Sequence, residues 1–453
     1  MKRVGLLAFS SAASTMGLEI VSDAVRETFP EWDVRTVDET TAKESDYLLV
    51  SLYWWRDVYE LPSFLDKIGL DPRSRRPIII VGGMMAVNPR PLEGYYHYAV
   101  CGDGEDVVGP LLSALEADED PYKIAGVWSQ DNCQMAVANH LPAKAYTEIR
   151  KNTVTRIEIA RGCKMGCRFC QLAGSKPYRE NPFPVIRQLV LSSKTKTIAL
   201  FAPDRASHSR FADIESMLSR YGKSNSGSDV RLTKLTGQSV ASTVRFGVES
   251  FSAAGRKRIG KPIGDENLLR HLRYVSEDLR TPKGKNLTSA TCYMIADLPG
   301  ESDEDFNAFW GVLRRWDETL SGRFTLFLSV SSFAPSPHTP MERDAVNPYS
   351  TFNARYQNSR PHFRRLVIAT RGALIGPGPR MCQMLAIRGD ESCRRAVYHI
   401  ATQERRLLRV TSPAAGRRVE AIVRASGSDP DLLHGEWPDD RPLPWSHVRR
   451  PWA

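Results

Sequence analysis

The chain has 453 residues, of which 42% are hydrophobic and 25% are charged. This length suggests two or three domains, and the composition supplies enough apolar residues to form their cores. No apolar run approaches the ~20 residues of a membrane-spanning helix. The apolar stretch near the N-terminus ends after Phe9. We therefore interpret it as a first strand and not a signal peptide, and we expect a cytoplasmic protein.

The net charge of +10 is unevenly distributed along the chain. Residues 351–453 carry 18 Arg, no Lys and 9 acidic residues, so this region is strongly basic and the rest of the chain is nearly neutral. The arginine side chain can bind phosphate through two parallel hydrogen bonds. The pattern therefore favours contact with nucleic acid or another phosphate ligand. The alternative is a solvated surface with internal ion pairs.

Residues 1–120 alternate between short apolar runs and helix-like segments. Such alternation predicts a doubly wound parallel sheet of the Rossmann type. Two glycine-rich turns, at Gly82 and Gly83 and at residues 102–105, follow strands near the edge where such sheets bind ligands. Neither turn completes a dinucleotide-binding fingerprint, and tight turns alone would explain both. The strands are expected at residues 4–9, 34–37, 47–52, 78–81 and 98–101, with helices at 18–28, 61–68 and 107–115.

Residues 121–152 have little periodicity and are interpreted as a connector. Strand–helix alternation resumes over residues 153–342 and predicts a partial (β/α)6 barrel that is open on one side. Residues 343–453 are expected to form a small α+β region with helices near 353–372 and 391–408. The barrel strands are expected at residues 156–160, 197–201, 243–248, 288–296 and 324–332, with one more within 229–240 and a long helix over 303–320.

Three cysteines, Cys163, Cys167 and Cys170, follow the first expected barrel strand, with three and then two residues between them. Eight cysteines in a chain of this length do not form a disulfide scaffold, and the clustering of three favours a metal site. Three thiolates can bind three irons of a cubane cluster, which leaves the fourth iron open to a substrate or cofactor. Structural zinc is the main alternative, but it needs a fourth ligand, and no fourth Cys or His lies near in the sequence.

Residues 161–170 resemble the radical S-adenosylmethionine (SAM) superfamily, whose hallmark is Cys-x3-Cys-x-aromatic-Cys. The resemblance implies that the three cysteines hold a [4Fe–4S] cluster and that SAM chelates its fourth iron. Reduction of the cluster would then cleave SAM to a 5′-deoxyadenosyl radical. Phe169 could shield the cluster or pack on adenine, and the resemblance implies that Glu249 binds the ribose or the methionyl amine of SAM. Alternatively, Glu249 is a surface carboxylate paired with Arg245 or Arg256.

Two further stretches extend the resemblance. Residues 294–301 resemble the fifth strand of the family's barrel and the turn after it, but Asp297 stands where a glycine is usual. Residues 331–340 resemble the sixth-strand exit in the subgroup with an N-terminal cobalamin-binding-like domain, and residues 78–105 resemble that domain. The resemblance therefore covers nearly the full length of the chain. Uncharacterised bacterial members of this subgroup have a similar layout.

This subgroup implies a possible cobalamin site at Gly82 and Gly83. Cobalamin-binding domains often ligate cobalt through a histidine, whereas residues 1–96 contain none. His97 comes late in the domain, within an aromatic run, and is interpreted as structural. The domain therefore either binds cobalamin without such a ligand or has lost the cofactor and serves as a scaffold.

We expect a radical SAM enzyme that abstracts a hydrogen atom from its substrate. A basic region beside an open barrel can present one residue of a polyanion, so the predicted substrate is a nucleobase in DNA or RNA, modified by rearrangement or carbon–carbon bond formation. One alternative is a cobalamin-dependent radical methyltransferase acting on a peptide or small metabolite. Another is a non-catalytic iron–sulfur sensor or nucleic-acid-binding protein. The expected partners are nucleic acid, through residues 351–453, and an electron donor such as flavodoxin or ferredoxin.

Overall fold

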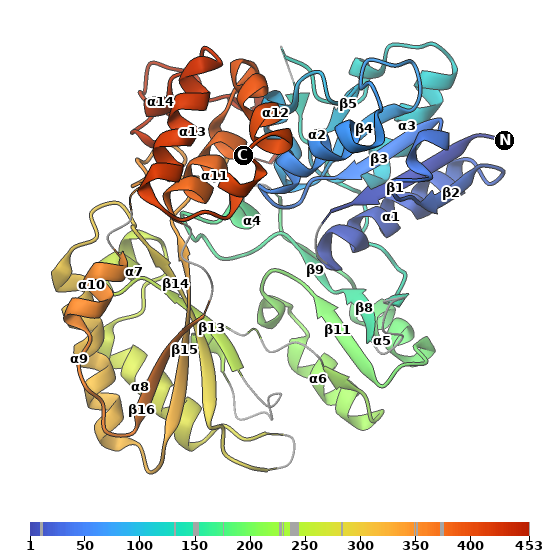
Figure 1. Ribbon diagram of the computed structural model, residues 1–453. Coiled ribbons are helices and arrows are strands. Elements are labelled where there is room, and N and C mark those ends of the chain that lie inside the picture. Colours follow the sequence, from blue (N-terminus) through green and yellow to red (C-terminus); the bar gives the residue numbers. More distant parts are fainter. Residues whose placement is uncertain are drawn as a thin grey trace.

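The computed structural model shows a mixed α/β chain built on parallel sheets (Figure 1). One sheet lies in the N-terminal part, and two four-stranded sheets lie in the middle of the chain. None of the helices in the described part is long and apolar enough to span a membrane. The structure describes residues 1–9, 12–130, 133–147, 154–174, 176–225, 229, 231–235, 244–281, 284–347, 349, 352–371 and 376–452.

The N-terminal sheet confirms the predicted alternation of strands and helices. Its elements are β1 (Arg3–Ala8), α1 (Ala12–Thr28), β2 (Asp33–Thr36), β3 (Tyr47–Ser51), α2 (Asp57–Ile68), β4 (Ile78–Gly82), β5 (Tyr98–Val100) and α3 (Glu105–Glu116). The strand order is β2-β1-β3-β4-β5, and all neighbours are parallel. This doubly wound order reverses direction between β1 and β3. Such sheets bind ligands at that point, outside the carboxyl ends of the strands.

The middle of the chain, predicted as a partial barrel, forms two four-stranded sheets. We refer to these two sheets and the helices between their strands as the barrel. One contains β7 (Tyr146–Thr147), β8 (Val154–Glu158), β11 (Thr197–Phe201) and β12 (Ser224–Asn225); the other contains β13 (Val244–Glu249), β14 (Ser289–Ala296), β15 (Phe324–Ser332) and β16 (Leu366–Arg371). All neighbours are parallel except β7 and β8. An isolated parallel bridge from Asp229 to Arg245 links β13 to the chain after β12. The strand predicted within 229–240 falls partly on residues 236–240, which lie outside the described residues.

Helices cover the outer side of these strands. They are α5 (Phe183–Ser192), α6 (Phe211–Arg220), α7 (Ala253–Arg258), α8 (Asp265–Glu277), α9 (Asp303–Thr319) and α10 (Phe352–Ser359). The strand residues Phe246, Met294 and Leu328 share one buried cluster with residues of α8 and α9. Because side chains alternate along a strand, Arg245 and Tyr293 face the opposite, inner side. The inner side of the second sheet is therefore partly polar.

The C-terminal helices pack against the N-terminal sheet and α2 (Figure 1). They are α11 (Pro377–Arg388), α12 (Arg394–Thr402), α13 (Pro413–Ala425) and α14 (Pro430–His434), followed by β17 (Val448–Arg449), which pairs with β6 (Cys133–Gln134). Leu61 and Leu65 of α2 share a buried cluster with Val397 and Ile400 of α12. The helix predicted at 391–408 is confirmed in α12. The helix predicted at 353–372 is wrong in its second half, because the branched apolar run there extends the sheet as β16.

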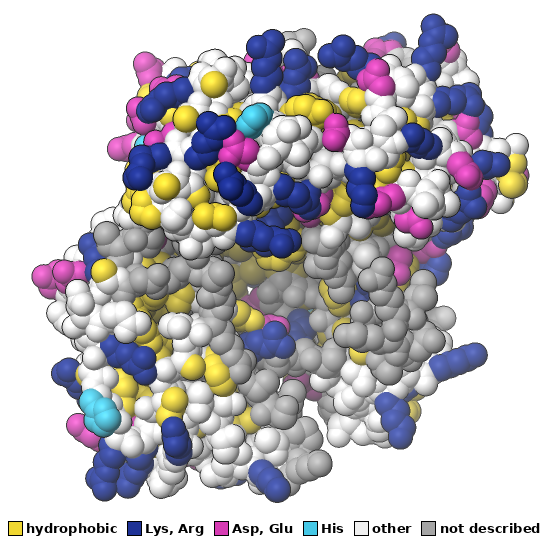
Figure 2. All heavy atoms as spheres, viewed as in Figure 1, with side chains coloured by type: hydrophobic (Ala, Val, Ile, Leu, Met, Phe, Trp, Pro, Cys, Tyr) yellow, Lys and Arg dark blue, Asp and Glu magenta, His cyan; other side chains and the backbone are white. Residues whose placement is uncertain are grey.

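Many C-terminal arginines bind groups within the protein. Arg388 is 1% exposed and donates to four backbone carbonyls. Arg405 pairs with Glu60 of α2, and Arg450 donates to the carbonyl of Gly174. On the face shown in Figure 2, lysine and arginine side chains are interspersed with acidic ones and do not form a single patch. The arginine excess therefore serves, at least in part, to tie this region to the rest of the chain.

We expect the substitution Arg388→Ala to lower the free energy of unfolding by about 3 kcal/mol, because several buried carbonyls lose their donor at once. Urea unfolding followed by far-UV circular dichroism measures this loss. The matched control is Arg395→Ala on the exposed surface of α12, which should change the value by less than about 0.5 kcal/mol. Equal losses in the two variants would contradict a structural role for Arg388.

Candidate active site at the cysteine loop

The three cysteines lie on a loop that leaves and re-enters the fold through a short antiparallel pair. Its two ends are β9 (Ala160–Arg161) and β10 (Arg179–Glu180), and we call this pair the neck of the loop. The loop contains the one-turn helix α4 (Gln171–Gly174). Cys163, Cys167 and Cys170 are free and only partly buried. Burial raises the pKa of each thiol, while the nearby cations Lys261 and Arg231 act in the opposite direction on the pKa of Cys167.

The three free thiols lie close together in the sequence of this one loop, between β9 and β10. Among the described residues, no group of three or more His, Cys, Asp or Glu side chains is arranged to hold a single metal ion. A cubane cluster differs from a single ion, because each thiolate binds a different iron at a separate corner. Three free thiols on one loop supply one donor to each of three such corners. The zinc alternative is not supported by this arrangement.

Other parts of the chain hold the loop in place. Gly260, with a φ of +74°, approaches so closely that a Cβ there would lie 2.4 Å from the carbonyl oxygen of Gly166. The amide of Arg168 donates to the carbonyl of Ile259 at 2.9 Å. The side chain of Gln171 donates to the carbonyl of Met84, next to the N-terminal sheet, at 3.1 Å. The barrel and the N-terminal sheet therefore both contact the loop.

Glu249 lies at the end of β13 in a left-handed conformation, with a φ of +70°. Its Oε1 accepts a hydrogen bond from Nζ of Lys261 at 3.0 Å. Burial raises the pKa of Glu249, and the Lys261 ammonium opposes this shift. A Cβ at Gly247 would lie 1.9 Å from the Glu249 carboxylate, so this ion pair requires glycine there. The pairing with Arg245 or Arg256 considered from the sequence is replaced by one with Lys261.

Phe169 is partly buried and packs against the cluster shared by the N-terminal sheet and the C-terminal helices. This position fits shielding of the cysteine loop from water. Phe169 lies on the cysteine loop itself, and Glu249 is linked to that loop through Lys261, which follows the Gly260 that contacts Gly166. Their contacts with SAM stay predictions. Lys261 was missed in the sequence, although it lies within the short run that follows α7.

A cavity of about 870 Å³ lies between the N-terminal sheet and the barrel strands. Its wall includes the carboxyl ends of β3, β4 and β5, the neck of the cysteine loop and the inner face of β14. The predicted residues Gly82 and Gly83 are part of this wall, together with Val50, Gly162, Leu172 and Tyr293. The cavity therefore joins the ligand edge of the N-terminal sheet to the neck of the cysteine loop. The three cysteines, Phe169 and Glu249 are not among the described residues that line it.

The N-terminal wall of the cavity suits a flat, largely apolar ligand. Gly82 has no atom closer than 3.9 Å to the position of a Cβ, so its backbone can be approached directly. No histidine is among the described residues that line the cavity. His97 is structural, as predicted: its Nδ1 accepts from the amide of Ile79, and its Nε2 lies 3.1 Å from the carbonyl of Ser74. A corrinoid held here would find no histidine among the described residues of the cavity wall, and both alternatives drawn from the sequence stay open.

Polar groups occupy two other parts of the wall. On the barrel side, the hydroxyl of Tyr293 donates to the Asp229 carboxylate at 2.9 Å. At the neck of the cysteine loop, Asp103, which follows β5 of the N-terminal sheet, pairs with Arg161. Neither pair was identified from the sequence. Asp103 lies in the glycine-rich turn at residues 102–105 that was noted in the sequence. The residues that its carboxylate binds are distant in the chain.

The turn after β14 shows how Asp297 can stand where the family usually has a glycine. This residue has a φ of +59°, a region that glycine favours and that aspartate tolerates better than most residues. Its amide donates to Oε2 of Glu301 at 3.1 Å. Arg380 of α11 is fully buried nearby, and its charge interacts with Asp297. Burial raises the pKa of Glu301 to about 8.

We expect Gly260→Ala to weaken iron retention by the cysteine loop. The added Cβ would press on the Gly166 carbonyl, and the left-handed conformation would be strained. Iron and sulfide bound per chain after anaerobic reconstitution measure the effect. The control is Gly264→Ala, four residues away, where nothing lies within 4 Å and φ is −68°. Full iron content in both variants would show that the close approach is not needed.

We expect Glu301→Gln to remove a pH-dependent loss of stability. Between the ordinary pKa of 4.5 and the raised pKa of about 8, the carboxyl ionises in the unfolded chain but stays protonated in the folded one. The free energy of unfolding of the wild type should therefore fall with rising pH in this window, by at most about 1.4 kcal/mol per pH unit. Urea titrations from about pH 5 to about pH 8 should show the flatter profile in the variant. The exposed control Glu304→Gln should keep the wild-type slope.

Comparison with known proteins supports the assignment made from the cysteine motif. Residues 31–126 match the family described as "Radical SAM proteins, N-terminal". An uncharacterised protein of Methanocaldococcus jannaschii is 22% identical over 382 residues, which is 77% of this chain and 79% of that protein.

Two solved structures share the fold. The radical SAM methyltransferase TsrM from Kitasatospora setae, with tryptophan substrate and a SAM analogue bound, has 12% identity and a TM-score of 0.54, covering 76% of this chain and 75% of its own. The cobalamin-dependent SAM radical enzyme OxsB, with aqua-cobalamin and SAM bound, has 13% identity and a TM-score of 0.52, covering 96% of this chain and 72% of its own. Residues 31–126 thus match a radical SAM family, and the chain is similar in fold to TsrM and OxsB.

Proposed function

We propose that this chain is a cobalamin-dependent radical SAM enzyme that methylates a small molecule or peptide. The observation that carries the proposal is a cavity of about 870 Å³ walled by the cysteine-loop neck, the barrel interior and the ligand edge of the N-terminal sheet. A doubly wound sheet binds its ligand at that edge. A corrinoid there would face the space in front of the cysteine loop.

The chain's own residues would have separate roles. Cys163, Cys167 and Cys170 would hold the cluster, and Glu249 with Lys261 would bind polar groups of SAM. When bound, the cluster and SAM supply radical chemistry and the corrinoid supplies methyl transfer. The apolar wall formed by the N-terminal sheet would exclude water from the cavity.

The polar pair on the barrel wall would orient the substrate. The Asp229 carboxylate accepts a hydrogen bond from the Tyr293 hydroxyl. It is therefore placed to accept a further hydrogen bond from an N–H or O–H of the substrate. Burial and Asp229 raise the pKa of Tyr293, so the phenol stays protonated at neutral pH. A small polar substrate is favoured by this lining, and an electron donor such as flavodoxin or ferredoxin would reduce the cluster.

The nucleobase hypothesis loses its main physical support. It depended on the arginines of residues 351–453, yet Arg388, Arg405 and Arg450 bind carbonyls and carboxylates within the protein. Of the two solved structures, TsrM is a methyltransferase with tryptophan bound and OxsB is a cobalamin-dependent enzyme. We therefore favour the cobalamin-dependent alternative.

The proposal is tested with anaerobically reconstituted protein and hydroxocobalamin. We expect the wild type to shift the corrinoid absorption bands on binding and to release 5′-deoxyadenosine or S-adenosylhomocysteine after reduction in the presence of SAM. Gly82→Leu places a side chain on the cavity wall and should weaken corrinoid binding at least about tenfold, since the bulk competes with the ligand. The control Gly311→Leu adds the same side chain on α9, where nothing lies within 4 Å of the Cβ position.

The outcomes separate the parts of the proposal. Wild-type protein that cleaves SAM but leaves the hydroxocobalamin spectrum unchanged would remove cobalamin and keep the radical SAM assignment. Equal corrinoid binding by wild type and Gly82→Leu would place the corrinoid elsewhere. Tight corrinoid binding that only Gly82→Leu weakens is the result expected from a shared cavity.

A further inference from the structure

The neck of the cysteine loop brings like charges face to face. Arg161 of β9 and Arg179 of β10 are directly opposite each other in a two-residue antiparallel pair. Like charges at such positions destabilise strand pairing. Lys176 adds a third cation on the same segment. Two residues of pairing cannot by themselves hold these charges together, so the neck depends on a counter-charge from elsewhere.

Asp103 supplies that counter-charge from the N-terminal sheet. Its Oδ1 lies 2.5 Å from Nζ of Lys176 and 3.0 Å from Arg161, and its Oδ2 lies 2.8 Å from Arg179. The amide of Ala138 donates to the same Oδ2 at 3.0 Å. The Asp103 side chain is 1% exposed, so these contacts are shielded from solvent and are strong.

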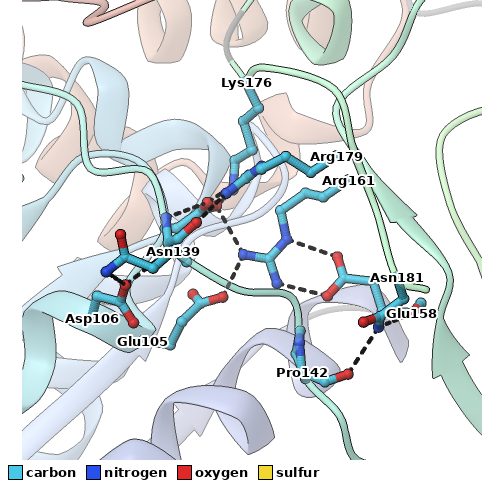
Figure 3. Close-up of polar contacts among 11 residues, drawn as sticks. Glu105, Asp106, Asn139, Pro142, Glu158, Arg161, Lys176, Arg179 and Asn181 are labelled. Carbon is cyan, nitrogen blue, oxygen red and sulfur yellow. Dashed lines mark hydrogen bonds and ion pairs between the residues drawn. The ribbon is translucent and has the colours of Figure 1, made fainter. Parts of the chain in front are cut away.

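Two more carboxylates complete the cluster around Arg161 (Figure 3). Glu158 accepts from Nε and NH2 of Arg161 at 2.8 and 2.6 Å in a bidentate pair. Glu105, at the start of α3, accepts from the third nitrogen. The described cluster thus balances the cations of the neck with carboxylates. Asp103 differs from the other carboxylates because it alone contacts both ends of the loop.

The position of the neck determines the position of the cysteines. Arg161 lies two residues before Cys163, and Gly162 between them has a φ of +73°. A Cβ at Gly162 would lie 2.4 Å from the carbonyl oxygen of Pro177, on the returning segment. The two sides of the neck are therefore in tight contact, and a separation of the arginines would move the first cysteine directly.

We propose that Asp103 is a positioning residue for the iron–sulfur site. It holds the two ends of the cysteine loop together from a different sheet, and so it sets the spacing of Cys163 from Cys167 and Cys170. The described contacts of its carboxylate are with the three neck cations and the amide of Ala138, and none is with a cysteine. The inference needs only the cluster and is independent of whether cobalamin binds.

The test compares Asp103→Asn with Asp106→Asn. Asp106 lies in the same turn and binds Asn139 of the connector, but it has no described contact with the neck, so it is a matched control. Groups that support metal ligands typically change metal retention by about 10- to 100-fold. We expect iron loss to a chelator to be faster by about that factor in Asp103→Asn and unchanged in Asp106→Asn.

A second variant and a second measurement separate positioning from general instability. In the double variant Asp103→Asn/Arg179→Gln, one of the facing cations is gone, and we expect slower iron loss than in Asp103→Asn alone. Thiol alkylation of the iron-free protein, mapped by mass spectrometry, should become faster at the three loop cysteines. Buried Cys292 and Cys382 should keep their wild-type rates.

Two results would overturn the proposal. One is iron loss from Asp103→Asn within about twofold of the wild type, far below the usual effect of a supporting group. The other is simultaneous exposure of the loop cysteines and of Cys292 and Cys382, which would mean that Asp103 stabilises the whole fold and has no specific effect on the loop.

Discussion

The cysteine loop has almost no regular structure of its own, so contacts from other segments must fix its shape. Between its two-residue neck and its single helical turn, few backbone groups bond within the loop. Gly260 of the barrel, Met84 beside the N-terminal sheet and Arg450 near the C-terminus each contact it. An unsupported loop would sample many conformations, and ordering it costs conformational entropy. Contacts from these three parts of the chain together offset the entropy lost on ordering the loop.

Electrostatics makes the N-terminal sheet indispensable to this arrangement. Burying a cation without a partner is strongly unfavourable, and the neck of the loop brings three cations close together. The carboxylate of Asp103 compensates them only when the N-terminal sheet lies against the barrel. The sheet is therefore a structural support of the cysteine loop as well as a surface for a ligand.

Local patterns in the sequence predicted the elements well, and pairings between distant residues were the part that could not be predicted. The apolar run of β4 and the acidic first turn of α9 fixed those elements, because burial and capping act within a few residues. β16 was missed because its partner β15 precedes it by more than thirty residues. The cysteines and Glu249 were recognised from motifs. Lys261 and Asp103 belong to no motif, and their contacts with these segments appear only in the folded chain. Arginine counts likewise gave no sign that Arg388 is buried.

The placement of Asp103 also bears on how the two ligand regions communicate. The loop from residues 102 to 105 lines the cavity at the ligand edge of the N-terminal sheet, and the Asp103 carboxylate on that loop binds the neck of the cysteine loop. A ligand that shifts this loop must also shift its buried ion pairs or break them, and breaking them is costly. If the proposed function holds, ligand binding in the cavity would therefore be coupled to the geometry of the cysteines through this one side chain. By linkage, an ordered cluster would favour ligand binding at the sheet edge to the same extent.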